Sequence, residues 1–192
     1  MHALVLDPPA TRARIEAIEP GGFTLLSSTL SPQVMADLGE AMLSSTTLEY
    51  LSPDCRQRDF APRPHKQDPT PDVEAILSGL GPLFEEAPIR TLVRIRRFNR
   101  YSLSSVSHTD NLYREKRLLI VAAGTGVFNT EGTPNRRTTR SEHPLGLGDM
   151  ALLDNTTPPE DRTLHFASTC NDLTLLMLGW HQAPGEATST LG

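Results

Sequence analysis

The chain has 192 residues, of which 38% are apolar, and a formal net charge of −5. This length fits a single domain with a core large enough to need no disulfides. The acidic balance argues against nucleic acid or an anionic membrane as the main partner. Cys55 and Cys170 form no zinc-binding or disulfide pattern, which favours a reducing compartment. No signal peptide and no run of roughly 18 apolar residues is present, so we expect a cytoplasmic protein.

The N-terminal half predicts two helices joined by a long loop. Ser31 is a candidate N-cap, and Pro32 with the helical spacing of the apolar residues after it predicts a helix over 31–44. The stretch "PDVEAILSGLGPLFEEA", residues 71–87, predicts a second helix. Residues 51–71 are rich in proline and charge, so we expect a long loop there and a candidate active-site lid.

From residue 91 the pattern changes to short strands. "TLVRIRRF" alternates apolar residues with arginines, and it is followed by "SLSSVS", "RLLIVAA", "GVFNT", "DMALLD", "TLHFA" and "LTLLMLGW". Residues 131–148, with Arg136, Arg137 and Arg140, are expected to form a second long loop and candidate lid. Strands that follow helices favour an α+β chain, mainly β, whose core is an antiparallel sandwich or small barrel.

A possible metal site lies within this strand-rich half. "SVSHTDNL" places His108 and Asp110 two positions apart, where side chains on a strand point the same way. A mononuclear non-haem iron site uses two histidines and one carboxylate, and His165 in "DRTLHFAS" is the candidate third ligand. An H-x-D pair also occurs in ordinary polar turns, and a single strand histidine is more often a core or surface residue. The spacing alone leaves both interpretations open.

The ordered series of motifs resembles the Fe(II)/2-oxoglutarate-dependent oxygenases, especially the branch of aspartyl/asparaginyl hydroxylases and cis-proline hydroxylases. "VRIRRFNRYSLSSVSHTDNL" resembles the strand that leads into H-x-D, and "RLLIVAAGTGVFNTEG" the strand pair after it. "HPLGLGDMALLDN" and "LHFASTCNDLTLLMLGW" resemble the segments around the distal histidine. The resemblance implies a double-stranded β-helix (jelly-roll or cupin-like) core with two N-terminal helices. One oxygenase domain would cover residues 1–182, with support over 1–88, the core over 89–182 and a disordered tail over 183–192.

The resemblance also implies the residues that bind Fe(II) and the co-substrate 2-oxoglutarate. His108, Asp110 and His165 would bind the metal, with His143 and His181 as alternatives for the third ligand because the segment before His165 is unusually long. The family commonly places a cation shortly after the distal histidine to bind the far carboxylate of 2-oxoglutarate, and "NDLTLL" has none.

Arginine is the preferred partner of a buried carboxylate, and Arg117 matches an arginine of related hydroxylases. We therefore assign three residues to 2-oxoglutarate: Arg117, Asn99 and Tyr101. Arg94 and Arg97 are assigned to the substrate, and Arg96 could point the same way as Arg94. Each of these side chains could instead belong to a solvated strand face or a polar strand end.

The implied reaction is hydroxylation or desaturation with release of succinate and CO2, because related halogenases lack the carboxylate that Asp110 supplies. Arginines near the site suit a small carboxylate-bearing substrate such as a free amino acid. Two other functions stay open. "FNRYSLSSVSH" also resembles a motif of alkylated-base demethylases, which act on nucleic acid. A non-catalytic cupin-like binding domain would explain the missing cation. The sequence makes no prediction of the oligomeric state.

Overall fold

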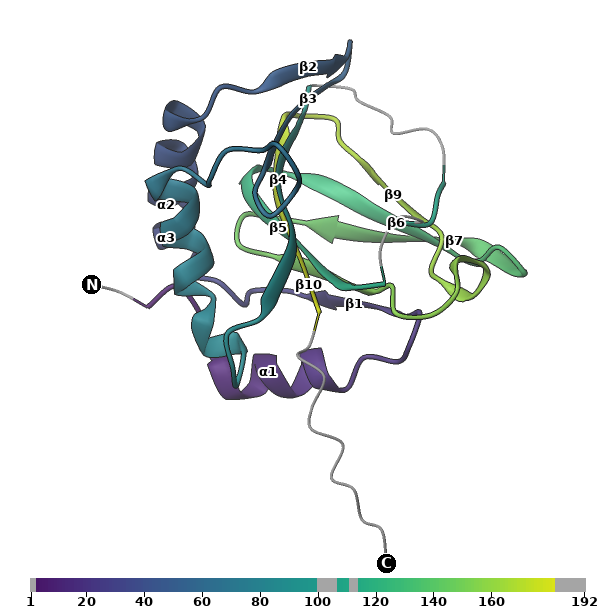
Figure 1. The fold of residues 1–192 in the computed structure, drawn as a ribbon. Helices are drawn as coiled ribbons and strands as arrows, with labels where there is room; N and C mark the ends of the chain where they lie inside the picture. The colour runs from purple at the N-terminus through teal and green to yellow at the C-terminus, as the bar shows by residue number, and fades with distance from the viewer. Residues whose placement is uncertain (1–2, 100–106, 111–113, 182–192) are drawn as a thin grey trace, which may run out of the picture.

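The computed structural model describes residues 3–99, 107–110 and 114–181. These residues form a mainly β structure of two antiparallel sheets with three α-helices (Figure 1). The helices are α1 (Pro8–Glu16), α2 (Pro32–Ser45) and α3 (Pro71–Gly79). The strands are β1 (Phe23–Leu26), β2 (Glu49–Ser52), β3 (Cys55–Phe60), β4 (Ile89–Phe98), β5 (Lys116–Gly124), β6 (Gly126–Thr133), β7 (Arg136–Leu145), β8 (Met150–Asp154), β9 (His165–Ser168) and β10 (Leu173–His181). No helix within the described ranges has both the length and the apolarity needed to cross a membrane.

Two of the three helices were predicted, with different success at their ends. The side chain of Ser31 accepts a hydrogen bond from the backbone N–H of Val34, and α2 follows close to its predicted bounds. The predicted helix over 71–87 is too long. α3 ends at Gly79, because Gly81 and Pro82 turn the chain into a single 3-10 turn.

Helix α1 was not predicted, because the adjacent Pro8 and Pro9 read as a break. In the structure these prolines occupy the first turn of the helix. Backbone N–H groups in this turn have no hydrogen-bond partner within the helix, so their absence in proline costs nothing. The side chain of Asp7 accepts a hydrogen bond from the backbone N–H of Ala10 and caps this turn. Two adjacent prolines are compatible with the first turn of a helix and with no later turn, so the sequence pattern did not indicate a helix here.

Both predicted long loops contain strands, which corrects the sequence interpretation. Within residues 51–71, β3 pairs along its whole length with β4. Residues 131–148 contain most of a hairpin in which β7 pairs with β6. β7 is one of the two edge strands of its sheet, and its side chains are exposed on both faces over most of its length. A strand that buries neither face needs no apolar residues, so its sequence lacks the alternation that identifies a strand.

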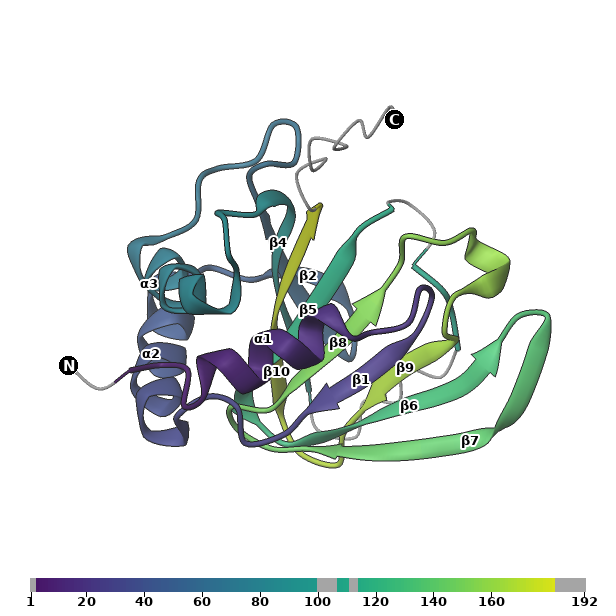
Figure 2. The same cartoon turned by 90° about the horizontal axis from the view of Figure 1, so that it is seen from below.

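The larger sheet has seven strands in the order β1-β8-β5-β10-β4-β3-β2, and the smaller sheet has three in the order β7-β6-β9. The helices cover one face of the larger sheet and the smaller sheet lies against the other (Figures 1 and 2). Side chains along β4 alternate between these two faces. Val93 and Ile95 join the core beneath the helices, whereas Leu92 and Phe98 join the core between the sheets. The space between the two sheets therefore receives Arg94 and Arg96.

Candidate metal centre

His108 and His165 lie directly opposite each other in an antiparallel bridge. The backbone N–H of each donates to the carbonyl of the other, at 3.1 and 2.9 Å. Opposed residues of such a bridge point to the same side, and Asp110, two positions along from His108, does so as well. Donor atoms of the three side chains lie within 4.8 Å of one another. Residues far apart in the sequence thus meet as a His-Asp-His cluster that could hold a metal ion.

The imidazole of His165 is oriented for metal binding. Its Nδ1 lies 3.0 Å from the backbone carbonyl of Thr163, which fixes the proton on Nδ1 and leaves the Nε2 lone pair available. Nε2 lies 3.6 Å from Oδ2 of Asp110, so one ion with bonds of about 2.1 Å can touch both atoms. Burial lowers the pKa of His165 from 6.5 to about 4, so the ring is neutral at pH 7. The ring also stacks on Phe128.

The carboxylate of Asp110 is held from several sides. Its Oδ1 pairs with Nη1 of Arg117 at 2.5 Å, and its Oδ2 accepts a hydrogen bond from Nδ2 of Asn155 at 3.3 Å. Arg162 donates a hydrogen bond to its backbone carbonyl. Burial raises the pKa of Asp110, but the charge of Arg117 and the adjacent histidines outweigh burial and hold the pKa below its ordinary value. The carboxylate is therefore ionised at neutral pH.

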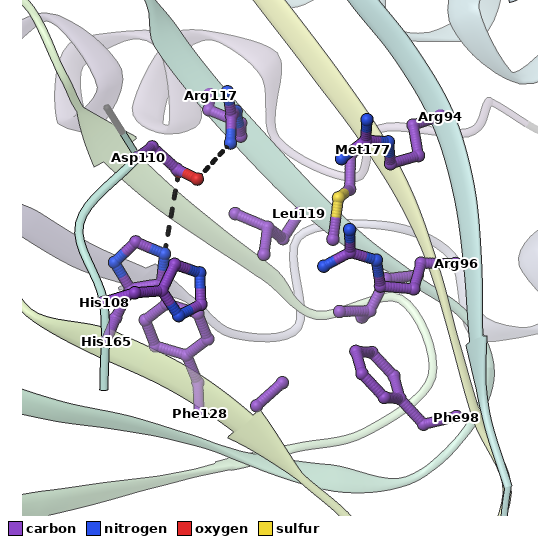
Figure 3. Close-up of a pocket in the computed structure, with 12 residues that line it drawn as sticks. Arg94, Arg96, Phe98, His108, Asp110, Arg117, Leu119, Phe128, His165 and Met177 are labelled. Atoms are coloured by element: carbon purple, nitrogen blue, oxygen red, sulfur yellow. Dashed lines mark ion pairs between the residues drawn. The ribbon is translucent and has the colours of Figure 1, made fainter. Parts of the chain in front are cut away.

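A cavity of about 120 Å³ separates this cluster from β4 (Figure 3). The cluster and Arg117 lie at one end, and Arg94 and Arg96 lie at the other. The remaining lining residues are mostly apolar and come from both sheets: Phe98, Leu119, Phe128, Ala167, Leu175 and Met177. A charged ligand in this cavity would meet a metal-binding group at one end and guanidinium groups at the other.

The two arginines of β4 have different partners on β3. Nε and Nη2 of Arg94 pair with the two oxygens of Asp59, at 2.5 and 2.9 Å. Nε and Nη2 of Arg96 donate to the amide oxygen of Gln57, at 3.1 and 2.7 Å. Among the described residues no carboxylate lies within ion-pair distance of Arg96. Burial, together with the charge of Arg94, lowers the pKa of Arg96 from its ordinary value.

Not every residue assigned to the co-substrate or substrate lies at the cavity. Arg97 points to the other side of β4 and pairs with Asp172 at 3.0 Å. Asn99 donates through Nδ2 to the backbone carbonyl of Pro53 and is not among the cavity's lining residues. Tyr101 lies outside the described residues. Arg97 and Asn99 are turned away because, from Leu92 to the end of β4, side-chain alternation sends the even-numbered residues inward.

The alternative histidines do not join the cluster. Nε2 of His143, on β7, lies 3.1 Å from the hydroxyl of Thr130, and its ring packs on Phe23. His181 is exposed at the end of β10. Of the three candidates for the distal ligand, the structure brings His165 to His108 and Asp110.

Sequence reasoning missed three buried polar residues beside the cluster: Glu115, Asn155 and Arg162. Glu115 is fully buried and its Oε1 accepts from Nε and Nη2 of Arg117. Asn155 directly follows β8, so the apolar run "MALLD" before it was the available signal. An isolated glutamate in "YREKR" gave no such signal, since its neighbours read as a solvated charged turn.

No family model matches the chain, and no curated protein matches it. Solved structures do match. An oxidoreductase of the 2OG-Fe(II) oxygenase family from Burkholderia pseudomallei aligns with a TM-score of 0.61 at 17% identity, over 91% of this chain and 89% of that one. This chain shares that protein's fold. HygX from Streptomyces hygroscopicus, solved with nickel and 2-oxoglutarate bound, aligns with a TM-score of 0.59 at 11% identity, over 84% of this chain and 83% of HygX.

Proposed function

We propose that this protein is a non-haem Fe(II)/2-oxoglutarate-dependent oxygenase that hydroxylates a small carboxylate-bearing substrate, such as a free amino acid. The observation that carries the proposal is the cluster of His108, Asp110 and His165 at one end of a cavity. The shared fold with a 2OG-Fe(II) oxygenase supports it. When bound, Fe(II) and 2-oxoglutarate supply the oxidation of a C–H bond by O2, with release of succinate and CO2.

The donor set fits this metal. Two neutral imidazoles and one carboxylate on one side of an ion form the ligand set of non-haem Fe(II) oxygenases, which keeps other positions open. His165 presents Nε2 because Thr163 holds Nδ1, and Asp110 stays ionised because Arg117 is beside it. His165 and Asp110 are therefore in the protonation states that metal binding requires.

We propose that Arg96, rather than Arg117, binds the far carboxylate of 2-oxoglutarate. Arg117 already pairs with the carboxylates of Asp110 and Glu115, so little of its charge remains for a ligand. Arg96 faces the cluster from the opposite end of the cavity and has only an amide partner on β3 (Figure 3). The carboxylate of 2-oxoglutarate would give Arg96 the negatively charged partner that stabilises a buried guanidinium. This assignment supplies the cation that is missing after the distal histidine.

The substrate carboxylate is proposed to bind Arg94, whose Nε and Nη2 are occupied by Asp59. Because Asp59 cancels most of the charge of Arg94, a second full negative charge gains little attraction there. An amino acid, whose ammonium and carboxylate cancel, suits this neutral pair better than a dianion. A panel of free amino acids and dicarboxylic acids, compared by thermal shift with metal and 2-oxoglutarate present, tests this choice; stronger stabilisation by dicarboxylic acids would contradict it.

The fold type and the branch of the oxygenases are also proposals. We propose that the two packed sheets form a double-stranded β-helix and that the chain lies near the aspartyl/asparaginyl and cis-proline hydroxylases. The H-x-D motif and the strands that flank it carry that resemblance. The proposed domain remains residues 1–182, in the reducing cytoplasm.

Anaerobic titration with Fe(II) and then 2-oxoglutarate tests the proposed function. Chelation of Fe(II) by 2-oxoglutarate gives a visible metal-to-ligand charge-transfer band, which we expect in the wild type and not in His165→Ala. His143→Ala is the matched control and should keep the band, since that ring lies outside the cluster. Bound iron with no band would sink the co-substrate assignment and favour a binding role. A charge-transfer band that shifts when methylated oligonucleotides are added, and not when amino acids are added, would favour the demethylase alternative.

A further inference from the structure

Glu115 is the most deeply buried carboxylate near the candidate metal centre. Its side chain has no exposed surface, and it lies directly before β5, on the side of Arg117 away from Asp110. Burying a carboxylate is costly unless charge and hydrogen bonds compensate for it. Here Arg117 donates from Nε at 3.0 Å and from Nη2 at 2.5 Å, and the hydroxyl of Thr91 donates to the other oxygen.

Two local features of the large sheet make room for this carboxylate. Gly179 on β10 lies opposite Arg117, and a Cβ at this position would lie 2.7 Å from the carboxyl atoms of Glu115. Any side chain at residue 179 would therefore displace the carboxylate. The pairing of β10 with β4 shifts by one residue at the same place, and the residue left out of register is Thr91. The glycine and the bulge together form a fitted compartment for one carboxylate.

Glu115 is also connected to both oxygens of Asp110. Its side chain holds Arg117, which pairs with Oδ1. Its backbone carbonyl accepts from the N–H of Asn155 at 2.9 Å, and the side chain of Asn155 donates to Oδ2. Without the negative charge of Glu115, the guanidinium of Arg117 would be held less firmly on this side and could rotate away from Asp110.

We propose that Glu115 is a positioning residue for the metal centre: through Arg117 and Asn155 it sets the orientation of the Asp110 carboxylate. The inference rests on the proposed function, because it assumes that Asp110 binds the metal. Arg117 occupies Oδ1 and leaves Oδ2 directed at the imidazole of His165, so the carboxylate would offer one oxygen to the ion. A purely structural ion pair would stabilise the fold without affecting this choice.

The test measures metal affinity by calorimetric titration of the chelator-treated protein with Mn(II) or anaerobic Fe(II), without co-substrate. Glu115→Gln keeps the size of the side chain and removes its charge, and we expect metal affinity to fall by about 10–100-fold, as for other residues that orient a metal ligand. Gly179→Ala should weaken binding in the same direction by pushing Glu115 out of place. Because both act through one group, the double variant should bind no more weakly than the weaker single variant.

Glu74→Gln is the matched control, because it breaks another two-bonded arginine–glutamate pair, with Arg90, away from the cavity. It should leave metal affinity unchanged. If far-UV circular dichroism shows that Glu115→Gln does not fold, Thr91→Val removes a single bond to the carboxylate and should still weaken metal binding several-fold. Wild-type affinity in folded Glu115→Gln, or in Thr91→Val where that variant is needed, would overturn the inference, as would additive effects in the double variant. Failure of the wild type to bind either ion would instead sink the metal centre itself, and this inference with it.

Discussion

The two ends of the cavity differ in how completely the chain satisfies its own polar groups. At the end that holds His108, Asp110 and His165, called the metal end below, Asp110 has partners on both oxygens, and Arg117 is shared by two carboxylates. At the other end, Arg94 is paired with a carboxylate, while the partner of Arg96 among the described residues is the amide of Gln57. Full satisfaction keeps ligand atoms in place before a metal arrives, whereas incomplete satisfaction leaves charge for an incoming anion. On the proposed assignment, position in the cavity alone does not make a side chain a binding group, because its partners within the protein decide how much charge it can offer.

The largest expected effect belongs to the metal end and concerns pH. His165 is buried and neutral, with a pKa lowered to about 4, whereas an unfolded histidine titrates near 6.5. Between these values the unfolded chain binds the extra proton, so the metal-free protein should lose about 3 kcal/mol of stability as pH falls from 6.5 to 4. Asp110, whose pKa is lowered, adds little in this window, because its contribution is lost mainly below about pH 5, where an unfolded aspartate takes up its proton. Urea unfolding across the window measures the slope.

His165→Phe should remove most of that slope, even though the substitution changes stability at every pH. His181→Ala, at an exposed residue, is the control and should keep it. If His165→Phe and the wild type lose stability equally between pH 6.5 and 4, the metal end does not hold a buried neutral histidine, and the contrast between the two ends fails.

The next effect concerns the arginine end. Arg96→Met keeps the length of the side chain and removes the free charge, and we expect 2-oxoglutarate affinity to fall by about 10–100-fold, as for loss of a hydrogen bond to a charged group. Arg94→Met should leave that affinity close to wild type, because Asp59 already occupies this guanidinium. Both variants should still bind metal. Equal losses in the two variants, measured by calorimetry with Mn(II) present, would show that the difference in partners has no consequence.

A smaller effect on 2-oxoglutarate affinity is expected when Gln57, the partner of Arg96 on β3, is replaced instead of the arginine itself. Gln57→Glu places a carboxylate opposite Arg96, which copies the situation of Arg94 and Asp59. The new glutamate should compete with 2-oxoglutarate and weaken its binding by about tenfold, the equivalent of about 1.4 kcal/mol. Gln57→Met, which removes the amide without adding charge, is the control. Tighter binding of 2-oxoglutarate by Gln57→Glu would rule out charge availability as the property that matters.

The smallest effect is predicted for Arg97, which directly follows Arg96 in the sequence but lies on the other face of β4. Its pair with Asp172 is solvent-exposed, so Arg97→Ala should cost less than about 1 kcal/mol in the free energy of unfolding. Affinities for metal and 2-oxoglutarate should not change. Urea unfolding and the calorimetric titrations above check both statements, and a clear loss of affinity would mean that the guanidinium reaches the cavity.

The sequence predicted the mainly β architecture and the residues that meet at the metal end, for identifiable reasons. The H-x-D spacing follows from the two-residue repeat of a strand, and His165 lies in an apolar stretch that reads as a strand. The sequence could not predict which arginines of "VRIRRF" face the cavity without a carboxylate partner on β3. That depends on Asp59 and Gln57, which reach β4 only through the pairing of a strand hidden in a proline-rich segment.

Glu115 illustrates a second limit of sequence reasoning. A charged residue in a charged turn is normally solvated, and only the packing of Gly179 on β10 against the start of β5 makes it buried. The same applies to the two strands that lie within the predicted loops. Long-range pairing, rather than local pattern, decides the conformation of β3 and β7.

The position of β10 also affects how the chain can fold during synthesis. It is the last strand that the described residues form, yet it lies between β5 and β4 in the middle of the seven-stranded sheet. Until residue 181 has left the ribosome, β4 and β5 have no common partner, and each presents an unpaired edge. The sheet therefore cannot close progressively from its N-terminal end. A nascent chain of this protein should depend on chaperones until β10 inserts, and ribosome-stalled fragments that end before Leu173 should remain sensitive to protease.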